Sequence, residues 1–232
     1  MDIDFGGKAA VVTGAAGALG RAVVEVLVGS GAVCHLPVLD RAAESLRGLE
    51  PSRCTVVPGV DLTSERAVSL FYASVPSIWA SIHVAGGFAM APVEKTSLED
   101  FQKMMGINAV TAFLCTREAV RRMGGDGGRI VNVAAATALD ARRGAGMAAY
   151  AASKAAVAAM TQAIAEEVKG LGIWVNAVAP SILDTPANRA AMPDADHDAW
   201  PKVDEVARTI VFLASPENRA TQGGVVPVFG RA

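Results

Sequence analysis

Tyr150 and Lys154 lie four residues apart, at the start of an alanine-rich run that continues to Glu167. Alanine is the strongest helix former, and residues four apart share one face of a helix. A phenol normally loses its proton near pKa ~10, and a lysine ammonium held beside it favours the phenolate. The spacing therefore predicts a tyrosine that transfers a proton near neutral pH, although the same pair also occurs in helices where both side chains only pack.

A glycine-rich turn near the N-terminus is a second pattern with chemical meaning. A strand-like run, 8–13, precedes the turn, and a helix-like run, 21–28, follows it. Glycine lets the backbone turn tightly and come close to a pyrophosphate at a helix N-terminus. The sequence therefore predicts a dinucleotide-binding turn. Its residues are Gly14, Gly17, Ala18, Leu19 and Gly20.

The second predicted strand, 33–39, is followed by Asp40, twenty residues after Gly20. An acid at this place can accept a hydrogen bond from the ribose 2′-hydroxyl and repels a 2′-phosphate, so NAD(H) is favoured. Arg41 can pair with that phosphate, which keeps NADP(H) as the alternative. Pro37 lies inside the same run, and because proline donates no ladder hydrogen bond it predicts a bulge.

Strand-like and helix-like runs alternate along the rest of the chain. The expected strands are 55–60, 81–84, 127–133, 174–178 and 224–229, and the expected helices are 64–74, 98–123, 150–170 and 203–214. This order predicts an α/β fold: a single-domain, Rossmann-type, doubly wound parallel sheet over residues 1–232, with helices on both faces. The proline-containing stretch 183–201 lacks a periodic pattern and is expected to be an irregular lid over the substrate.

Composition and charge exclude several other classes of protein. A net charge of −2 with scattered arginines gives no basic stripe for nucleic acid. No apolar run approaches the ~20 residues of a membrane span, and the acidic N-terminus is unlike a signal peptide. Cys34, Cys54 and Cys115 are few and odd in number, which favours reduced thiols and a cytoplasmic location. The three histidines show no ligand spacing, so no metal is expected.

Six motifs, in order along the chain, make it resemble the short-chain dehydrogenase/reductase family. They are Thr13-Gly14 with Gly20, Asp61-Leu62, Ala85-Gly86-Gly87, Asn108, Tyr150-Ala-Ala-Ser-Lys154 and Pro180. The resemblance implies a nicotinamide cofactor, with Tyr150 as proton donor or acceptor and Lys154 as the residue that holds the ribose and lowers the pKa of Tyr150. It implies that Asn108 holds a kinked helix and a water in the proton path. The implied cofactor contacts are Asp61, Leu62, Ala85, Gly86, Gly87, Pro180, Leu183 and Thr185.

The serine with which this family polarises the substrate carbonyl is absent from its usual place. Counted from the strand 130–133, the position falls on Ala135, and counted back from Tyr150 it falls on Thr137. Thr137 either supplies the hydroxyl or is only a loop residue. Loss of one such donor costs on the order of 10² in rate.

Two family glycines are also replaced, by Ala18 in the turn and by Ser181 after Pro180. The methyl group of Ala18 reduces the clearance at the turn. The C-terminal lid is similar to that of dihydropteridine reductase, in the stretches 183–189 and 192–196 and in Trp200. That branch also lacks the serine, and it reduces a quinonoid dihydropterin, which accepts hydride readily.

These features predict an NAD(P)-dependent oxidoreductase that passes a hydride between nicotinamide and a small carbonyl or quinonoid substrate, with a pterin as one candidate. Two alternatives stay open: a cofactor-binding regulator or interaction protein without turnover, and a non-redox enzyme that retains NAD. The resemblance implies a homodimer or homotetramer formed through 98–123 and 150–170. Lid residues that could contact the substrate are Asn188, Arg189, Asp194, Asp196 and His197, and Arg142 and Arg143 could meet an anionic one.

Overall fold

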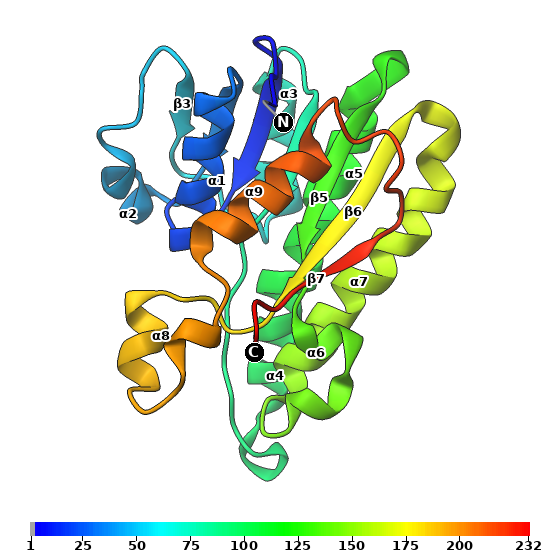
Figure 1. Ribbon diagram of the computed structural model, residues 1–232. Coiled ribbons are helices and arrows are strands. Elements are labelled where there is room, and N and C mark those ends of the chain that lie inside the picture. The colour runs from blue at the N-terminus through cyan, green and yellow to red at the C-terminus, as the bar shows by residue number, and fades with distance from the viewer. Residues whose placement is uncertain (1–2) are drawn as a thin grey trace.

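A computed structural model describes residues 3–232, which form one seven-stranded parallel sheet in the order β3-β2-β1-β4-β5-β6-β7 (Figure 1). The strands are β1 (Ala9–Thr13), β2 (Val33–Pro37), β3 (Cys54–Val57), β4 (Ala80–His83), β5 (Gly128–Val133), β6 (Ile173–Pro180) and β7 (Val225–Val228). β1 and β4 are neighbours although β2 and β3 separate them in the sequence. The strand order reverses there, and sheets of this kind bind ligands at such a point, beyond the carboxyl ends of the strands.

Helices cover both faces of the sheet, which confirms the expected doubly wound α/β fold (Figure 1). On one face α1 (Ala18–Gly29) packs against α9 (Val203–Ala214), and their buried side chains form one core with β1 and β2. On the other face α3 (Glu65–Ser74), α5 (Thr111–Met123) and α7 (Ala148–Val168) form a second core. The shorter helices are α2 (Asp40–Ala43), α4 (Leu98–Met104), α6 (Ala136–Leu139) and α8 (Pro186–Ala191).

Two helical regions differ from the sequence-based expectation. The first helix begins at Ala18, three residues earlier than expected, so part of the glycine-rich turn forms its first turn. The expected helix 98–123 is divided into α4 and α5 by a π-helical turn, Met105–Val110. Such turns are common at functional sites because they displace a residue from the regular helical position. Here the turn contains Asn108.

The expected bulge at Pro37 is wrong. The register between β2 and β3 is regular from Cys34 opposite Cys54 to Pro37 opposite Val57. On its other side, the pairing of β2 with β1 ends at His35. Pro37 therefore lies beyond the β1 ladder, where its missing N–H leaves no strand hydrogen bond unmade.

The segment 183–201, called the lid below, is more regular than expected. It contains α8 and a 3₁₀ turn at His197–Ala199. Thr185 caps α8, since its hydroxyl oxygen accepts a hydrogen bond of 3.2 Å from the Asn188 N–H, and Pro186 follows at the first helical position. A threonine cap followed by proline is a recognised helix start, so a local signal for this helix was present in the sequence.

His83 at the end of β4 is the centre of a buried polar network. Its Nδ1 lies 2.8 Å from Asn132 Oδ1, which can only accept, so Nδ1 carries the proton. Its Nε2 lies 2.8 Å from the Ser81 hydroxyl, which in turn lies 2.8 Å from the Tyr72 hydroxyl. Burial lowers the pKa of His83 from 6.5 to about 4. The folded protein therefore holds this histidine in its neutral form.

Because the unfolded chain protonates His83 near pH 6.5 and the folded one only near pH 4, its contribution to stability is complete above pH 6.5 and decreases as the pH falls. We expect the free energy of unfolding in urea to fall by roughly 2 kcal/mol between pH 7 and pH 5 from this residue. The variant His83→Asn should lose much of this pH dependence while being less stable at pH 7. An equal pH dependence in both proteins would show that other groups cause it.

Candidate active site

A cavity of about 630 Å³ opens at the carboxyl ends of the strands, where β1 and β4 lie side by side. It is lined by most of the residues that the sequence singles out, although these are spread over 170 positions. Of the predicted site residues, those in its lining are Gly14, Gly17, Ala18, Leu19, Gly20, Arg41, Asp61, Leu62, Ala85, Gly86, Gly87, Tyr150, Lys154 and Leu183. The fold therefore brings the predicted cofactor turn and the Tyr150–Lys154 pair into one space.

Two glycines of the turn have no room for a side chain. Gly14 has a φ of +70°, and a Cβ on it would lie 2.6 Å from the Ala85 backbone nitrogen. A Cβ on Gly20 would lie 2.1 Å from the Gly14 carbonyl oxygen. Both contacts are far below van der Waals distance, so close packing of β1, β4 and α1 requires glycine at both places.

The first turn of α1 faces the cavity, and its backbone is suited to an anion. Gly17 is the N-cap, and Ala18, Leu19 and Gly20 follow as the first helical residues. The N–H groups of a first helical turn have no partners within the helix and carry the positive end of its dipole. Ala18 is exposed, so its methyl group extends from the turn without closing the cavity. This arrangement fits a pyrophosphate.

At the other end of the turn, the structure separates Asp40 from Arg41. Arg41 lines the cavity, together with Asp61 and Leu62. Asp40 is exposed and, within the described part of the chain, does not line it; its Oδ1 lies 3.4 Å from where a Cβ on Gly59 would be. The carboxylate on which the NAD(H) preference rests therefore points away from the cavity in this structure.

Asn108 connects the cavity floor to α7. Its Oδ1 accepts a hydrogen bond of 3.0 Å from the Gly87 N–H, and its Nδ2 donates to the Gly87 carbonyl and to the Ser153 hydroxyl, both at 3.0 Å. The Ser153 hydroxyl in turn donates to the Tyr150 carbonyl at 2.7 Å. The side chain thus fixes the loop after β4 against the helix that carries Tyr150.

Lys154 is buried and points back to the sheet. Its Nζ donates a hydrogen bond of 2.7 Å to the Val133 carbonyl at the end of β5. A Cβ on Gly86 would lie 2.5 Å from Asn108 Oδ1 and 3.5 Å from Lys154 Nζ, so both polar groups converge on this glycine. Burial lowers the pKa of Lys154 to about 8. The ammonium can therefore exchange a proton near neutral pH.

The expected lowering of the Tyr150 pKa by Lys154 is wrong for this structure. Burial raises the pKa of Tyr150 to about 12. The ammonium of Lys154 is engaged by the Val133 carbonyl, and the Tyr150 ring packs edge to face against Phe88, with ring centroids 5.0 Å apart. Tyr150 is consequently held as the neutral phenol, which is the form that can donate a proton.

Neither of the two positions at which the family's serine is expected, 135 and 137, places a hydroxyl in the cavity. Thr137 is buried on α6 and does not line the cavity, and its Oγ1 has no hydrogen-bond partner among the described residues. Its methyl group lies beside Gly144 instead. Ala135 is the N-cap of α6 and carries no hydroxyl. Neither position therefore supplies the missing hydroxyl, and Tyr150 lines the cavity together with Lys154.

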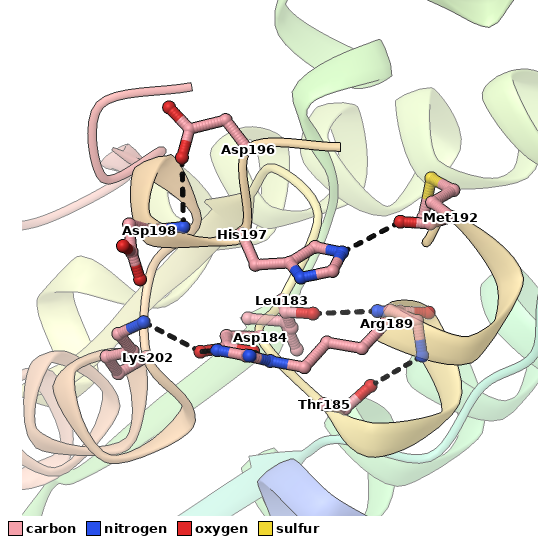
Figure 2. A network of polar contacts seen from close by, with 10 residues as sticks. Leu183, Asp184, Thr185, Arg189, Met192, Asp196, His197, Asp198 and Lys202 are labelled. Atoms are coloured by element: carbon pink, nitrogen blue, oxygen red, sulfur yellow. Dashed lines mark hydrogen bonds and ion pairs between the residues drawn. The ribbon is translucent and has the colours of Figure 1, made fainter. Parts of the chain in front are cut away.

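Some of the residues after β6 that were predicted to contact the cofactor instead make contacts within the lid. Pro180 is buried and ends β6, and the Thr185 hydroxyl caps α8. Leu183 lines the cavity with its side chain, while its carbonyl accepts a hydrogen bond of 2.8 Å from Asn188 Nδ2 (Figure 2). Ser181, in place of a glycine, donates to the Phe229 carbonyl at 2.9 Å.

A nearly buried carboxylate joins the two ends of the lid. Asp184 accepts hydrogen bonds of 2.6 and 2.9 Å from Arg189 on α8 and one of 2.7 Å from Lys202, which directly follows the lid (Figure 2). These contacts hold the pKa of Asp184 well below its usual range. Nearby, His197 Nε2 lies 2.7 Å from the Met192 carbonyl. The lid is thus closed on itself by its own polar groups.

Three functional positions are not predicted from the sequence: Phe88, Ile107 and Ser153. Phe88 and Ile107 line the cavity, and Ser153 links Asn108 to α7. Each is adjacent to a recognised motif residue, so proximity in the sequence was the available signal.

Residues 3–232 contain no group of three His, Cys, Asp or Glu side chains placed to hold a metal ion. No helix among them is long and apolar enough to cross a membrane.

Comparison with known proteins identifies relatives over nearly the whole chain. The family model described as short chain dehydrogenase matches residues 8–196. A short-chain type dehydrogenase/reductase of Picea abies is 30% identical over 97% of this chain and 92% of its own length. The 3-beta-hydroxysteroid dehydrogenase of Comamonas testosteroni is 31% identical, with 94% and 92% covered.

A solved structure agrees with these matches. The blue fluorescent protein from a metagenomic library, crystallised in complex with NADPH, superposes with a TM-score of 0.85 and 28% identity, and 98% of each chain is covered. Its ligand shows that this fold accommodates a nicotinamide dinucleotide. With the strand order, the glycine-rich turn and the Tyr150–Lys154 pair in place, this chain belongs to the short chain dehydrogenase family of NAD(P)-binding oxidoreductases.

Proposed function

We propose that this protein transfers a hydride between a nicotinamide dinucleotide and a small carbonyl or quinonoid substrate, with Tyr150 as the proton donor or acceptor. The observation that carries the proposal is that Tyr150 and Lys154 line the same cavity as the glycine-rich turn. Proton transfer at a substrate oxygen requires a titratable group beside the place where hydride is exchanged. A quinonoid dihydropterin is one candidate substrate, from the similarity of the lid.

The cavity suits the cofactor that the family binds. The turn Gly14–Gly20 and the start of α1 would hold the pyrophosphate, Asp61 and Leu62 would flank the adenosine, and Lys154 would meet the ribose next to the nicotinamide. Because a Cβ would fill the space at Gly14 or Gly20, the backbone there is shaped for close approach. A bound nicotinamide dinucleotide supplies or accepts a hydride, which carries the two electrons of the reaction.

In the direction of reduction, Tyr150 donates its phenolic proton to the substrate oxygen as the π bond of the carbonyl breaks. The oxygen binds the proton with the electron pair of that bond, the carbon receives the hydride that the cofactor would supply, and the carbonyl becomes an alcohol. Lys154, with a pKa of about 8, can then return a proton towards the phenolate, and Asn108 lies beside it at Gly86. With Ala135 in place of the serine, Tyr150 stabilises the developing charge without a second hydroxyl, which suits an electrophilic substrate.

A second function from another class is a cofactor-binding regulator without turnover. Two observations favour it: no hydroxyl lines the cavity at position 135 or 137, and the pKa of Tyr150 is raised rather than lowered. Catalysis is favoured by the convergence of Asn108 and Lys154 on Gly86 and by the presence of Tyr150 in the lining of the same cavity. A non-redox enzyme that retains NAD is the third reading, and it would keep the absorbance of its bound cofactor constant during turnover.

We propose NAD(H) as the preferred cofactor. Asp61 lines the cavity together with Arg41, and Asp40, which precedes Arg41 in the chain, would add a second carboxylate at the adenosine end if its side chain turned towards the cavity. Two acids repel a 2′-phosphate more than one arginine attracts it when all three are solvated. The neighbours of Asp40 in the chain, Leu39 and Arg41, both line the cavity, so Asp40 lies at its edge.

We also propose that the lid covers the substrate and that the protein works as a homodimer or homotetramer. The lid follows β6 directly and contributes Leu183 to the cavity. On the helices expected to form the subunit contact, Phe101, Val110 and Phe113 are each more than 40% exposed, so an apolar surface is available there. A cytoplasmic location fits the three cysteines, which are free and buried in the described structure.

Replacing Tyr150 with Phe removes only the hydroxyl and should reduce turnover by roughly 10²–10⁴. The dissociation constant for NADH, measured by fluorescence, should stay nearly the same. Tyr72→Phe is the matched control, because it deletes the other tyrosine hydroxyl of the chain, outside the cavity. Unchanged turnover in Tyr150→Phe would remove Tyr150 from the proposed role.

The cofactor preference depends on Asp40 and Arg41 in opposite ways. We expect NADH to bind the natural protein at least about tenfold tighter than NADPH, and Asp40→Ser to tighten NADPH binding about tenfold. Arg41→Ala should weaken NADPH and leave NADH nearly unaffected. If NADPH binds more tightly to the natural protein and Asp40→Ser has no effect, Arg41 sets the preference and the cofactor is NADP(H).

Asp184→Asn keeps the size of the side chain and removes the charge that joins Arg189 to Lys202. Because a displaced lid misplaces the substrate, kcat/KM should fall between roughly 10- and 100-fold, mainly through KM. Asp204→Asn is the control, since it breaks an exposed pair with Arg208 on α9, where an effect near zero is expected. Equal kinetics in both variants would mean that the lid position does not depend on Asp184.

A further inference from the structure

The three loops around Tyr150 expose apolar side chains. They follow the neighbouring strands β4, β5 and β6, so they meet at one end of the sheet. Phe88 and Met90 after β4 are 59% and 62% exposed, Leu139 after β5 is 45% exposed, and Ile182 after β6 is 40% exposed. Phe88 also packs on Tyr150 and lines the cavity, so this exposed side chain is part of the site.

The charged and polar groups of the same loops are largely occupied by one another. Of the arginines that could meet an anionic substrate, Arg142 pairs with Asp140 at 2.9 Å, and the Arg143 guanidinium lies over the Phe229 ring, 5.1 Å from its centre; neither is among the residues that line the cavity. Asp140 and Arg142 are exposed enough for water to compete, but their charges cancel locally.

In the lid the pattern is the same (Figure 2). Arg189 is held by two hydrogen bonds to Asp184, Asn188 donates to the Leu183 carbonyl, and His197 contacts the Met192 carbonyl. Asp196 accepts from the Asp198 N–H at 3.2 Å. Four of the five lid residues that the sequence offers as substrate contacts are thus used to hold the lid together.

We propose that the substrate of this site is an uncharged, flat and largely apolar carbonyl compound, such as an aromatic ketone or a quinone, bound by Phe88, Met90 and Ile182. The inference rests on the proposed function and narrows its substrate class. A pterin ring presents several donors and acceptors, and a pocket without matching partners would leave them unpaired at a cost. An apolar ring has no such groups and gains from contact with the exposed side chains. The carboxylate of a charged substrate would find no cation among Phe88, Met90 and Ile182 and would lose part of its solvation beside them.

The test compares acetophenone, 4-acetylbenzoate and a quinonoid dihydropterin. Acetophenone and 4-acetylbenzoate share ring and ketone and differ by one carboxylate. Binding is measured by ligand-observed NMR on protein saturated with NAD⁺, which cannot reduce a ketone, and turnover is measured separately by NADH absorbance. We expect acetophenone to bind at least about tenfold tighter than 4-acetylbenzoate and the pterin. Equal or tighter binding of either polar compound, or no binding of acetophenone, overturns the proposal.

The two readouts separate this inference from the proposed function. If acetophenone binds preferentially but no compound oxidises NADH, the substrate class stands and the redox function fails. If a polar compound is both bound and reduced best, the redox function stands and the substrate class is wrong.

Substitutions at Phe88 test whether this side chain contacts the ring of the substrate. Phe88→Ala should weaken acetophenone binding about fivefold or more, and Phe88→Leu should restore part of it. Leu171→Ala, which truncates an exposed leucine before β6 at the opposite end of the sheet, is the matched control and should have no effect. Equal binding in Phe88→Ala and Leu171→Ala would exclude Phe88 from the proposed contact.

Discussion

The close approach of backbone to backbone at the β1–β4 crevice is the constraint on which the rest of the site depends. Gly14, Gly20 and Gly86 each lie where a single added carbon would come within 2.6 Å of another atom. Their lack of side chains lets α1 begin directly against β1 and lets the loop after β4 pass beneath it. The Thr13 hydroxyl, which accepts from the Ala85 N–H at 3.1 Å, fixes the same junction. The cavity and its anion-binding helix terminus follow from this packing.

A chain of hydrogen bonds links the loop after β4 to the helix that carries Tyr150 and Lys154. It runs from Gly87 through the Asn108 side chain and Ser153 to the Tyr150 backbone, and a separate bond ties Lys154 to the end of β5. The π-helical turn is what allows Asn108 to take part, since it interrupts an otherwise continuous helix. Buried side chains with all their partners supplied are held rigidly, so the distance between cofactor turn and phenol is set by the fold.

Burial shifts the two titratable groups of the site in opposite directions. The phenol of Tyr150 becomes harder to ionise, and the ammonium of Lys154 becomes easier to neutralise, because each loses solvation of its charged form. Both pKa shifts favour the state in which Tyr150 is a neutral phenol and Lys154 is a neutral amine. The protein therefore presents a proton donor in a mainly apolar surrounding, which agrees with an electrophilic, uncharged substrate.

The sequence by itself determined the fold class, the glycine-rich turn, and the Tyr150–Lys154 pair, because these depend on periodicity, on glycine and on spacing along one helix. Only the tertiary structure decided which way individual side chains point. Asp40 and Arg41 are adjacent in the chain, yet only Arg41 lines the cavity. Thr137 carries the right hydroxyl, but α6 packs it against Gly144. Burial raises the pKa of Tyr150, and that burial depends on contacts such as the one with Phe88, which is distant in the sequence.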